Sequence, residues 1–208
     1  MIGLMMKMNK VEVIENYLDE MFKDPKCELK YHNDYELLIA IVLSAQTTDK
    51  RVNKVSRILF SKYPSLKELS EAKIEDIENI IKKIGTYHKK AVFVHEIALK
   101  LLDKKDLNDR AFLESLSGVG RKTANVFLAE IYNEPTIAVD THVSRVSKRL
   151  GFCNVEDDVL TIERKLMKLI PKERWNRTHH QLVLFGRYYC KALKPECENC
   201  KLKDICKK

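Results

Sequence analysis

Apolar residues recur along most of this chain at intervals of three and four positions, which is the spacing of one face of an α-helix. The clearest stretches are residues 13–21, 52–60, 74–84, 87–102, 160–170 and 175–189. Residues 37–45 are apolar on almost every side, and because the chain offers no second strand to pair with them, they predict a central buried helix. Strand signals are nearly absent, so the pattern predicts an all-α fold.

Glycine, asparagine and proline mark where the predicted helices end. Gly85 should cap the isoleucine-rich helix before it, and residues 133–135, Asn-Glu-Pro, should end a helix that begins near Arg121. Residues 136–139 then predict a connector, and helices resume after Asp140.

The sequence LSGVGRKTAN at residues 116–125 predicts a hairpin that leads into a helix. Gly118 and Gly120 allow a tight turn and close approach to a partner, and the first amides of the next helix form a natural anion site. Lys122 falls in the first turn of that helix. There the helix dipole and neighbouring Arg121 favour the neutral amine that a nucleophile needs.

A carboxylate follows this hairpin, because Asp140 lies in the sequence VDTH. Considered alone, Lys122 would be interpreted as a solvated surface lysine, and Asp140 as an aspartate that caps a helix. Their occurrence together with the glycine hairpin favours a lysine nucleophile with a carboxylate partner.

The 208 residues include 38 Lys and Arg against 30 Asp and Glu, a net charge of +8. This mild excess suits a polyanion such as nucleic acid. The chain contains no apolar run of about 18 residues, and residues 1–8 lack the long apolar region and cleavage site of a signal peptide. We therefore expect a soluble protein that remains inside the cell.

Four of the six cysteines crowd into the C-terminal segment with the spacing C-x6-C-x2-C-x5-C: Cys190, Cys197, Cys200 and Cys206. Four thiolates suit either a tetrahedral zinc ion or an iron–sulfur cluster, and their spacing leaves both open. Cys27 and Cys153 stand apart and are expected to be buried, inert thiols. Lysines of the same segment, among them Lys191 and Lys194, predict a basic surface that binds phosphates.

In this order, LSGVGRKTAN, TIAVDTH and the cysteine spacing resemble the endonuclease III family of helix-hairpin-helix DNA glycosylases. LSAQTTD at residues 43–49 and IGTYHKKA at residues 84–91 fit the same family, and the resemblance spans residues 35–206. It implies two helical lobes with a DNA cleft between them.

The implied lobes divide the chain unevenly. A six-helix barrel with the helix-hairpin-helix would take residues 27–135, and a second helical lobe would take residues 1–26 with residues 136–208. The second lobe would carry a [4Fe-4S] cluster in the loop of residues 190–206, held by the four cysteines.

The resemblance also implies roles for individual residues. Lys122 would be the nucleophile and Asp140 the carboxylate that stabilises positive charge on the sugar. Gln46 would fill the hole left by a flipped nucleotide, and Thr86 would lie beside the orphaned base, where relatives commonly carry an apolar wedge. The remaining DNA contacts would be hairpin amides and cations that bind phosphates: Gly118, Gly120, Arg121, Lys191 and Lys194.

The implied activity is base excision repair. A monomer would remove oxidised or ring-saturated pyrimidines from double-stranded DNA and cleave the abasic site by β-elimination through a lysine Schiff base. Two other classes stay open at this point: a non-enzymatic helix-hairpin-helix DNA-binding module, and a structural zinc protein.

Overall fold

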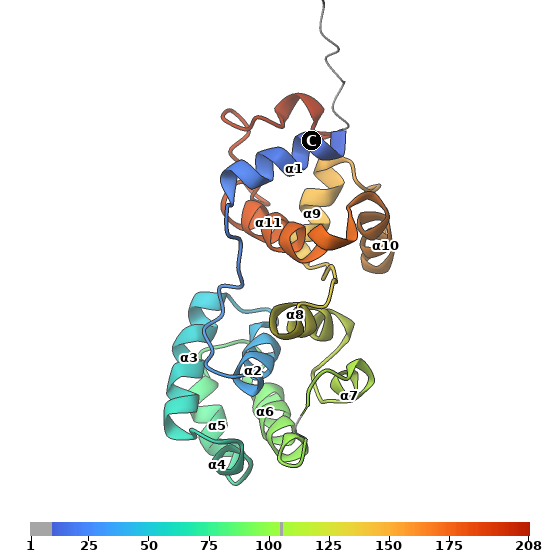
Figure 1. Cartoon of the computed structure of the whole chain (residues 1–208). Helices are drawn as coiled ribbons and strands as arrows, with labels where there is room; N and C mark the ends of the chain where they lie inside the picture. The colour runs from blue at the N-terminus through green and yellow to red at the C-terminus, as the bar shows by residue number, and fades with distance from the viewer. Residues whose placement is uncertain (1–9, 105) are drawn as a thin grey trace, which may run out of the picture. The chain divides into compact units, whose positions relative to one another are not determined.

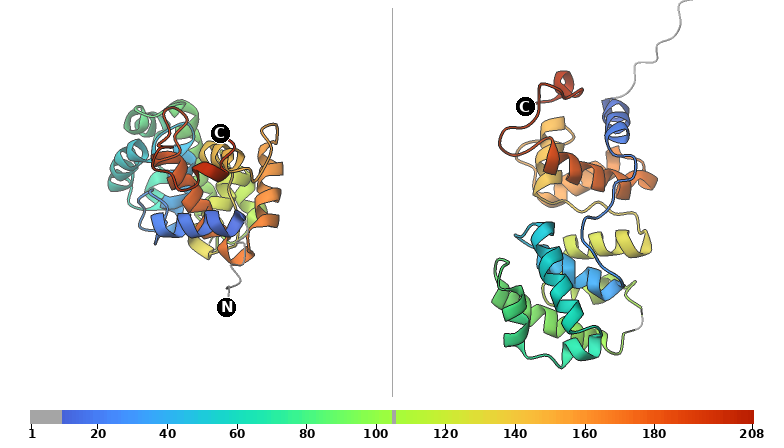
Figure 2. Two further views of the ribbon diagram at one scale, coloured as in Figure 1. Left: turned by 90° about the horizontal axis from the view of Figure 1, so that it is seen from above. Right: turned by 90° about the vertical axis from the view of Figure 1, so that its left-hand side faces the viewer.

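The computed structural model describes residues 10–104 and 106–208, which form eleven α-helices, two short 3-10 helices and no β-strand (Figures 1 and 2). The all-helical prediction is therefore confirmed. Residues 1–8, expected to lack the features of a signal peptide, lie outside the described residues. Within the described part of the chain, no helix has the length and hydropathy needed to cross a membrane.

The chain divides into two compact units. Residues Cys27–Glu134 form the inserted unit, and residues 10–26 together with Pro135–Lys208 form the terminal unit. The inserted unit interrupts the terminal unit in the sequence, so helices from both ends of the chain complete a single core.

The inserted unit is built around α2 (Asp34–Ser44), which packs against three other helices of the unit (Figure 1). The side chain of Asn33 caps α2 by accepting a hydrogen bond from the Glu36 amide at 3.1 Å. Residues 37–43 are at most 6% exposed, which confirms the predicted central helix. The other helices are α3 (Asp49–Lys62), α4 (Leu66–Ser70), α5 (Ile74–Ile81), α6 (Tyr87–Leu101), α7 (Arg110–Glu114) and α8 (Arg121–Tyr132).

The end of α5 differs from the prediction. The helix stops at Ile81, and the chain turns through residues 82–85 with a hydrogen bond of 3.0 Å from the Ile84 amide to the Ile81 carbonyl. The residue with left-handed backbone is Thr86, at φ 53°, and not Gly85. The prediction that Gly85 caps α5 was wrong because the turn already redirects the chain before this glycine.

The terminal unit is centred on α11 (Trp175–Tyr188), which packs against α9 (Thr141–Leu150) and α1 (Lys10–Met21). Ile14 and Leu18 are the fully buried apolar residues of α1, and the predicted apolar face at residues 13, 17 and 21 flanks them. The unit also contains α10 (Val159–Leu169), η1 (Lys172–Arg174) and η2 (Lys203–Ile205).

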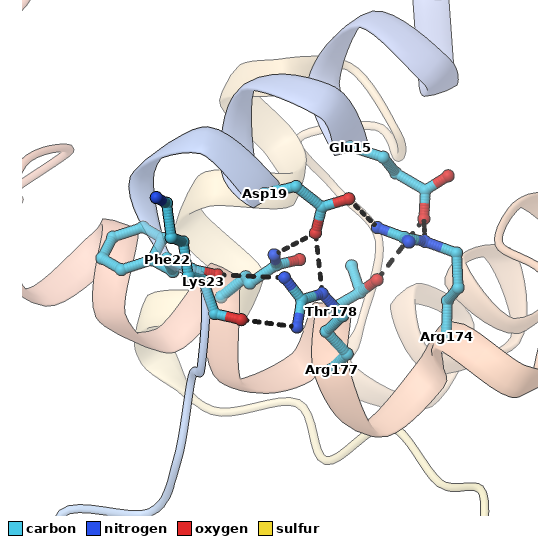
Figure 3. Close-up of polar contacts among 8 residues, drawn as sticks. Glu15, Asp19, Phe22, Lys23, Arg174, Arg177 and Thr178 are labelled. Atoms are coloured by element: carbon cyan, nitrogen blue, oxygen red, sulfur yellow. Dashed lines mark hydrogen bonds and ion pairs between the residues drawn. The ribbon is translucent and has the colours of Figure 1, made fainter.

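A network of ion pairs fastens α1 to η1 and α11 (Figure 3). Arg174 donates to Glu15 at 2.6 Å and to Asp19 at 2.9 Å, and Arg177 donates to Asp19 at 2.7 Å. Arg177 also donates to the carbonyls of residues 22 and 23, at the C-terminal end of α1. Burial opposes the charge on Asp19, but these arginines and Gln181 hold the pKa of its carboxyl below the usual value.

The two isolated cysteines differ in burial. Cys153 is 5% exposed, and burial raises the pKa of its thiol, as expected of an inert residue. Cys27 is only half-buried, so the expectation of full burial was wrong for this residue. Cys27 lies at the edge of the inserted unit, where it packs against the core without entering it.

Candidate functional site

The predicted glycine hairpin connects α7 to α8 in the inserted unit. The Val119 amide donates to the Leu116 carbonyl at 3.0 Å, and Gly118 turns the chain with φ +78°. A Cβ atom at Gly118 would lie 2.6 Å from Cδ2 of Phe93 and 3.1 Å from Cγ1 of Val42. Both the backbone conformation and the close approach therefore require glycine at this position.

The hairpin leaves the N-terminus of α8 uncapped by any side chain, because its N-cap residue is Gly120. Apart from Gly120 and its two chain neighbours, no described residue has an atom within 4 Å of the position that a Cβ of Gly120 would take. Arg121 and Lys122 form the first turn of the helix, and both are exposed. The first amides of α8 and these two cations thus form a positive, open surface suited to an anion.

Asp140 is the N-cap of α9 in the terminal unit. Its Oδ1 accepts a hydrogen bond from the Val143 amide at 2.7 Å, and the residue is half-buried. The four residues before it are buried and adopt no helix or strand, which confirms the predicted connector. Lys122 and Asp140 belong to different units, and each is held by the local geometry of its own helix start.

Gln46 and Thr86 lie on neighbouring loops of the inserted unit. Both are exposed and both have left-handed backbone, with φ 54° at Gln46 and 53° at Thr86. The two loops touch through Gly85, where a Cβ would lie 3.7 Å from the carbonyl oxygen of Gln46. A non-glycine residue with positive φ costs about 1 kcal/mol or more, and such conformations cluster at functional sites.

The four C-terminal cysteines line one cavity of about 510 Å³ in the terminal unit, together with residues of α1 and α11 such as Tyr17 and Phe185. Burial raises the pKa of the Cys200 thiol, and repulsion from the other three sulfurs raises it further. Among the described residues, no group of three or more His, Cys, Asp or Glu side chains is arranged to hold a metal ion. Four thiols around one cavity are nevertheless the donor set of an iron–sulfur cubane, with one thiolate for each iron.

Arg149 of α9 joins the two ends of the cysteine segment. Its guanidinium donates to the Lys191 carbonyl at 2.7 Å and to the Cys190 sulfur at 3.3 Å. Its own carbonyl accepts from the Lys207 amide at 2.7 Å and from the Cys206 thiol at 3.3 Å. One residue therefore fixes the first and last of the four cysteines relative to α9.

The lysines of the cysteine segment divide into paired and exposed groups. Lys191 forms an ion pair with Glu196 at 2.8 Å, whereas Lys194 is exposed on a left-handed turn at φ 50°. The same unit also contains a basic hollow of about 780 Å³. Its cationic lining residues are Arg145, Lys148, Arg149 and Lys207.

Several structurally important polar residues escaped the sequence analysis. Arg145 and Arg149 lie four residues apart on α9, both directed at carbonyls near Cys190. Lys90 is buried at 3% exposure although lysine is usually on the surface. Its only signal is that it falls in phase with the buried positions of α6, including Val94 and Ile97.

Comparisons with known proteins extend this description. Residues 39–172 match the HhH-GPD superfamily of base excision DNA repair proteins. Endonuclease III of Bacillus subtilis (strain 168) is 42% identical over 206 residues, which cover 98% of this chain and 94% of that protein. Endonuclease III of Escherichia coli (strain K12) is 42% identical over 207 residues, which cover 96% of each chain.

Comparison with solved structures indicates the same family. A trapped endonuclease III–DNA covalent intermediate matches with a TM-score of 0.90 at 47% identity, over 96% of both chains. A thermostable thymine-DNA glycosylase matches with a TM-score of 0.82 at 21% identity, which indicates a shared fold alone. On its family match and its near full-length likeness to these relatives, the chain belongs to the endonuclease III family of the HhH-GPD superfamily.

Proposed function

We propose that this protein is a bifunctional DNA glycosylase and abasic-site lyase of base excision repair, acting on oxidised or ring-saturated pyrimidines in double-stranded DNA. The observation that carries the proposal is Lys122, an exposed amine in the first turn of α8, beside a hairpin whose amides can receive a phosphate. A relative 47% identical to this chain has been trapped as a covalent intermediate with DNA, which supports a nucleophile of this kind.

Base removal would begin with extrusion of the damaged nucleotide from the duplex. Unstacking costs a few kcal/mol and is cheapest for bases that stack or pair poorly. The Lys122 amine then attacks C1′ of the flipped sugar, and the glycosidic bond breaks as the base leaves with the bonding electrons. Asp140 stabilises the positive charge that develops on the sugar and accepts the proton from the attacking nitrogen.

Strand cleavage would follow from the product of this attack. Ring opening gives an imine between Lys122 and C1′, which makes the C2′ proton acidic. Loss of that proton expels the 3′ phosphate by β-elimination, and water then hydrolyses the imine to release the enzyme. Replacing Lys122 with a residue that has no amine would stop the reaction before strand cleavage.

The cysteine cavity would hold a [4Fe-4S] cluster through Cys190, Cys197, Cys200 and Cys206. When bound, the cluster supplies a rigid cross-link for a segment that has little regular secondary structure of its own. Arg149 would orient the first ligand by donating a hydrogen bond to the Cys190 sulfur.

DNA would be bound mainly through its phosphates. The amides of the hairpin at Gly118 and Gly120, with Arg121, would hold one stretch of backbone, and Lys191 and Lys194 would hold another. Such contacts give affinity that falls with salt and carry no sequence information. Lesion choice would then depend on extrusion, with Gln46 and Thr86 inserted into the duplex. We expect a monomer that acts on DNA inside the cell.

Borohydride trapping tests this function directly. The protein is incubated with a duplex that contains one ring-saturated pyrimidine, sodium borohydride is added, and the crosslinked peptide is mapped. We expect a crosslink on Lys122, and we expect Lys122→Gln to lose both the crosslink and strand cleavage while it still binds the duplex.

Two other outcomes would revise the proposal. Release of free base without any crosslink would indicate a glycosylase that uses water instead of an amine. Binding without base release or cleavage, on this lesion and on a plain abasic site, would favour a non-enzymatic DNA-binding module.

A further inference from the structure

Lys90 of α6 is a buried cation in the inserted unit. The residue is only 3% exposed, and desolvation lowers the pKa of its ammonium group. The ammonium donates to the carbonyls of Leu43 at 2.9 Å and Ala45 at 2.6 Å, and to Thr47 Oγ1 at 3.3 Å. All three acceptors are neutral oxygens, so this charge is held by hydrogen bonds that end on a single short stretch of chain.

The three acceptors surround Gln46. Leu43 and Ala45 carry carbonyls at the C-terminal end of α2, which are left without helical partners and lie at the negative end of the helix dipole. Thr47 follows on the other side of Gln46, and its amide donates to the Ser44 carbonyl at 3.0 Å. The hydrogen bonds of Lys90 therefore stabilise the turn at Gln46. The backbone of Gln46 has φ 54° in this turn, and its side chain is exposed.

The backbone of the same lysine holds the second loop. The Lys90 amide donates to the Thr86 carbonyl at 3.1 Å and so forms the first turn of α6. Thr86 has φ 53°, and its hydroxyl donates to the Gly85 carbonyl at 2.8 Å. The side chain of Lys90 thus fixes the Gln46 loop, and its backbone fixes the start of the helix that carries Thr86.

Stability alone does not explain a lysine at this position. Burying a charge is costly, and an apolar side chain of similar volume often serves a core equally well or better. The neighbouring buried residues of α6 on this face are apolar, as Ala91 and Val94 illustrate. What an apolar residue cannot supply is three donors that hold the turn around Gln46 in one geometry.

We propose that Lys90 is the positioning residue for the DNA-inserting surface: it fixes the Gln46 loop against the Thr86 loop so that both enter the duplex together when a nucleotide is extruded. This inference rests on the proposed function, since it assigns Gln46 and Thr86 to insertion. Lys90 acts through these two residues and contacts neither the reacting atoms nor the flipped base.

The test compares two activities of the intact protein. Base release from a duplex with a ring-saturated pyrimidine requires extrusion of a stacked base, whereas cleavage at a preformed abasic site requires much less unstacking. We expect Lys90→Met to slow base release by about tenfold to a hundredfold, as small misplacements in other enzymes do, and to slow cleavage of the abasic duplex by less than about threefold. Lys90→Gln keeps a neutral donor and serves as the second variant if Lys90→Met does not fold.

Lys89→Met is the matched control. Lys89 is the exposed neighbour on the same helix, so this variant removes the same charge without touching the Gln46 loop. A 2-aminopurine base beside the lesion reports extrusion by its fluorescence. We expect the fluorescence rise to be lost in Lys90→Met and retained in Lys89→Met.

A double-mutant cycle shows whether Lys90 acts through Gln46. If it does, Gln46→Ala should reduce base release, and adding Lys90→Met should cause little further loss. Multiplicative effects of the two changes, or equal losses of base release and abasic cleavage accompanied by a lower melting temperature, would overturn the inference in favour of a general structural role. Absence of base release by the unaltered protein would instead refute the proposed function.

Discussion

The Oδ1 atom of Asp140 lies 2.7 Å from the amide nitrogen of Val143, so the proposed catalytic carboxylate is also the cap of α9. The two roles can be separated because a capping bond needs an oxygen acceptor and charge stabilisation needs a carboxylate. Asp140→Asn should keep the cap and change the free energy of unfolding by less than about 0.5 kcal/mol. Base release should fall by about a hundredfold.

Asp140→Ala completes the comparison because it removes the cap as well, at a further cost of about 1 kcal/mol. Single-turnover base release and urea unfolding would be measured on both variants. If Asp140→Asn kept full base release, the carboxylate would be a cap alone.

The two hairpin glycines should respond differently to alanine. Gly118→Ala should lower the free energy of unfolding by about 2 kcal/mol or more, because its φ is +78° and a Cβ would meet the Phe93 ring at 2.6 Å. Gly120 has an extended backbone and free space around its Cα. Gly120→Ala should therefore change the free energy of unfolding by less than about 1 kcal/mol. Its added methyl group should instead weaken DNA binding, measured by titration with labelled duplex; unchanged affinity would argue against phosphate contact at this point.

The ion-pair network around Asp19 should make the terminal unit sensitive to acid. A carboxyl whose pKa is lowered in the folded protein stabilises fully above its unfolded-state value, 3.8, and loses this contribution as the pH falls through the folded-state value. Asp19→Asn should therefore cost about 2 kcal/mol at pH 7, and the difference from the unaltered protein should shrink below pH 3.8.

Urea unfolding across this pH range checks the prediction. Asp24→Asn is the control, because its carboxylate is 73% exposed and pairs with Lys26 at the surface. A pH-independent loss in Asp19→Asn would mean that packing, and not charge, holds α1 in place.

Replacement of a cluster ligand should remove the cofactor. Cys200→Ser should abolish the visible absorbance and the bound iron of the purified protein, and it should lower the melting temperature of the terminal unit. Cys153→Ala is the matched control, since Cys153 is buried in the same unit outside the cavity. A colourless unaltered protein with one equivalent of zinc would contradict the iron–sulfur assignment.

The lysines of the cysteine segment should differ in their contribution to DNA binding. Lys194→Gln should reduce the slope of log affinity against log salt by about 1 if this exposed lysine binds a phosphate. Lys191→Gln should change the slope less, because Glu196 already neutralises Lys191. If neither variant changed affinity or its salt dependence, the segment would not be a phosphate clamp.

The sequence was sufficient for much of the fold because most helices are long and bury one clear face. The helix of residues 37–45 was predicted from its continuous apolar run. The turn at residue 118 was predicted because glycine allows such a backbone conformation. Helices α4 and α7 were not delimited, since each has five residues and spans too few turns to show a period.

The remaining features depend on contacts between distant residues. Lys90 is identical in type to its exposed neighbour Lys89, and only the tertiary structure brings the α2 carbonyls to one of them. The same holds for Asp19 and Arg174, which are 155 residues apart in the sequence. A local pattern therefore predicts where a helix lies but not which of its charged residues a distant segment will bury.

The placement of α1 also has a consequence during synthesis, because α1 is made first and packs against the α-helix that is made last. Glu15 leaves the ribosome 159 residues ahead of its partner Arg174. At 5–20 residues per second, the apolar face around Ile14 and Leu18 must wait on the order of 10–30 s before α11 exists to cover it. The inserted unit, Cys27–Glu134, is continuous in sequence and can complete its own core during that interval. The nascent chain is therefore most vulnerable to aggregation and proteolysis at its first helix, which stays uncovered until after Lys122 and Asp140 have been made.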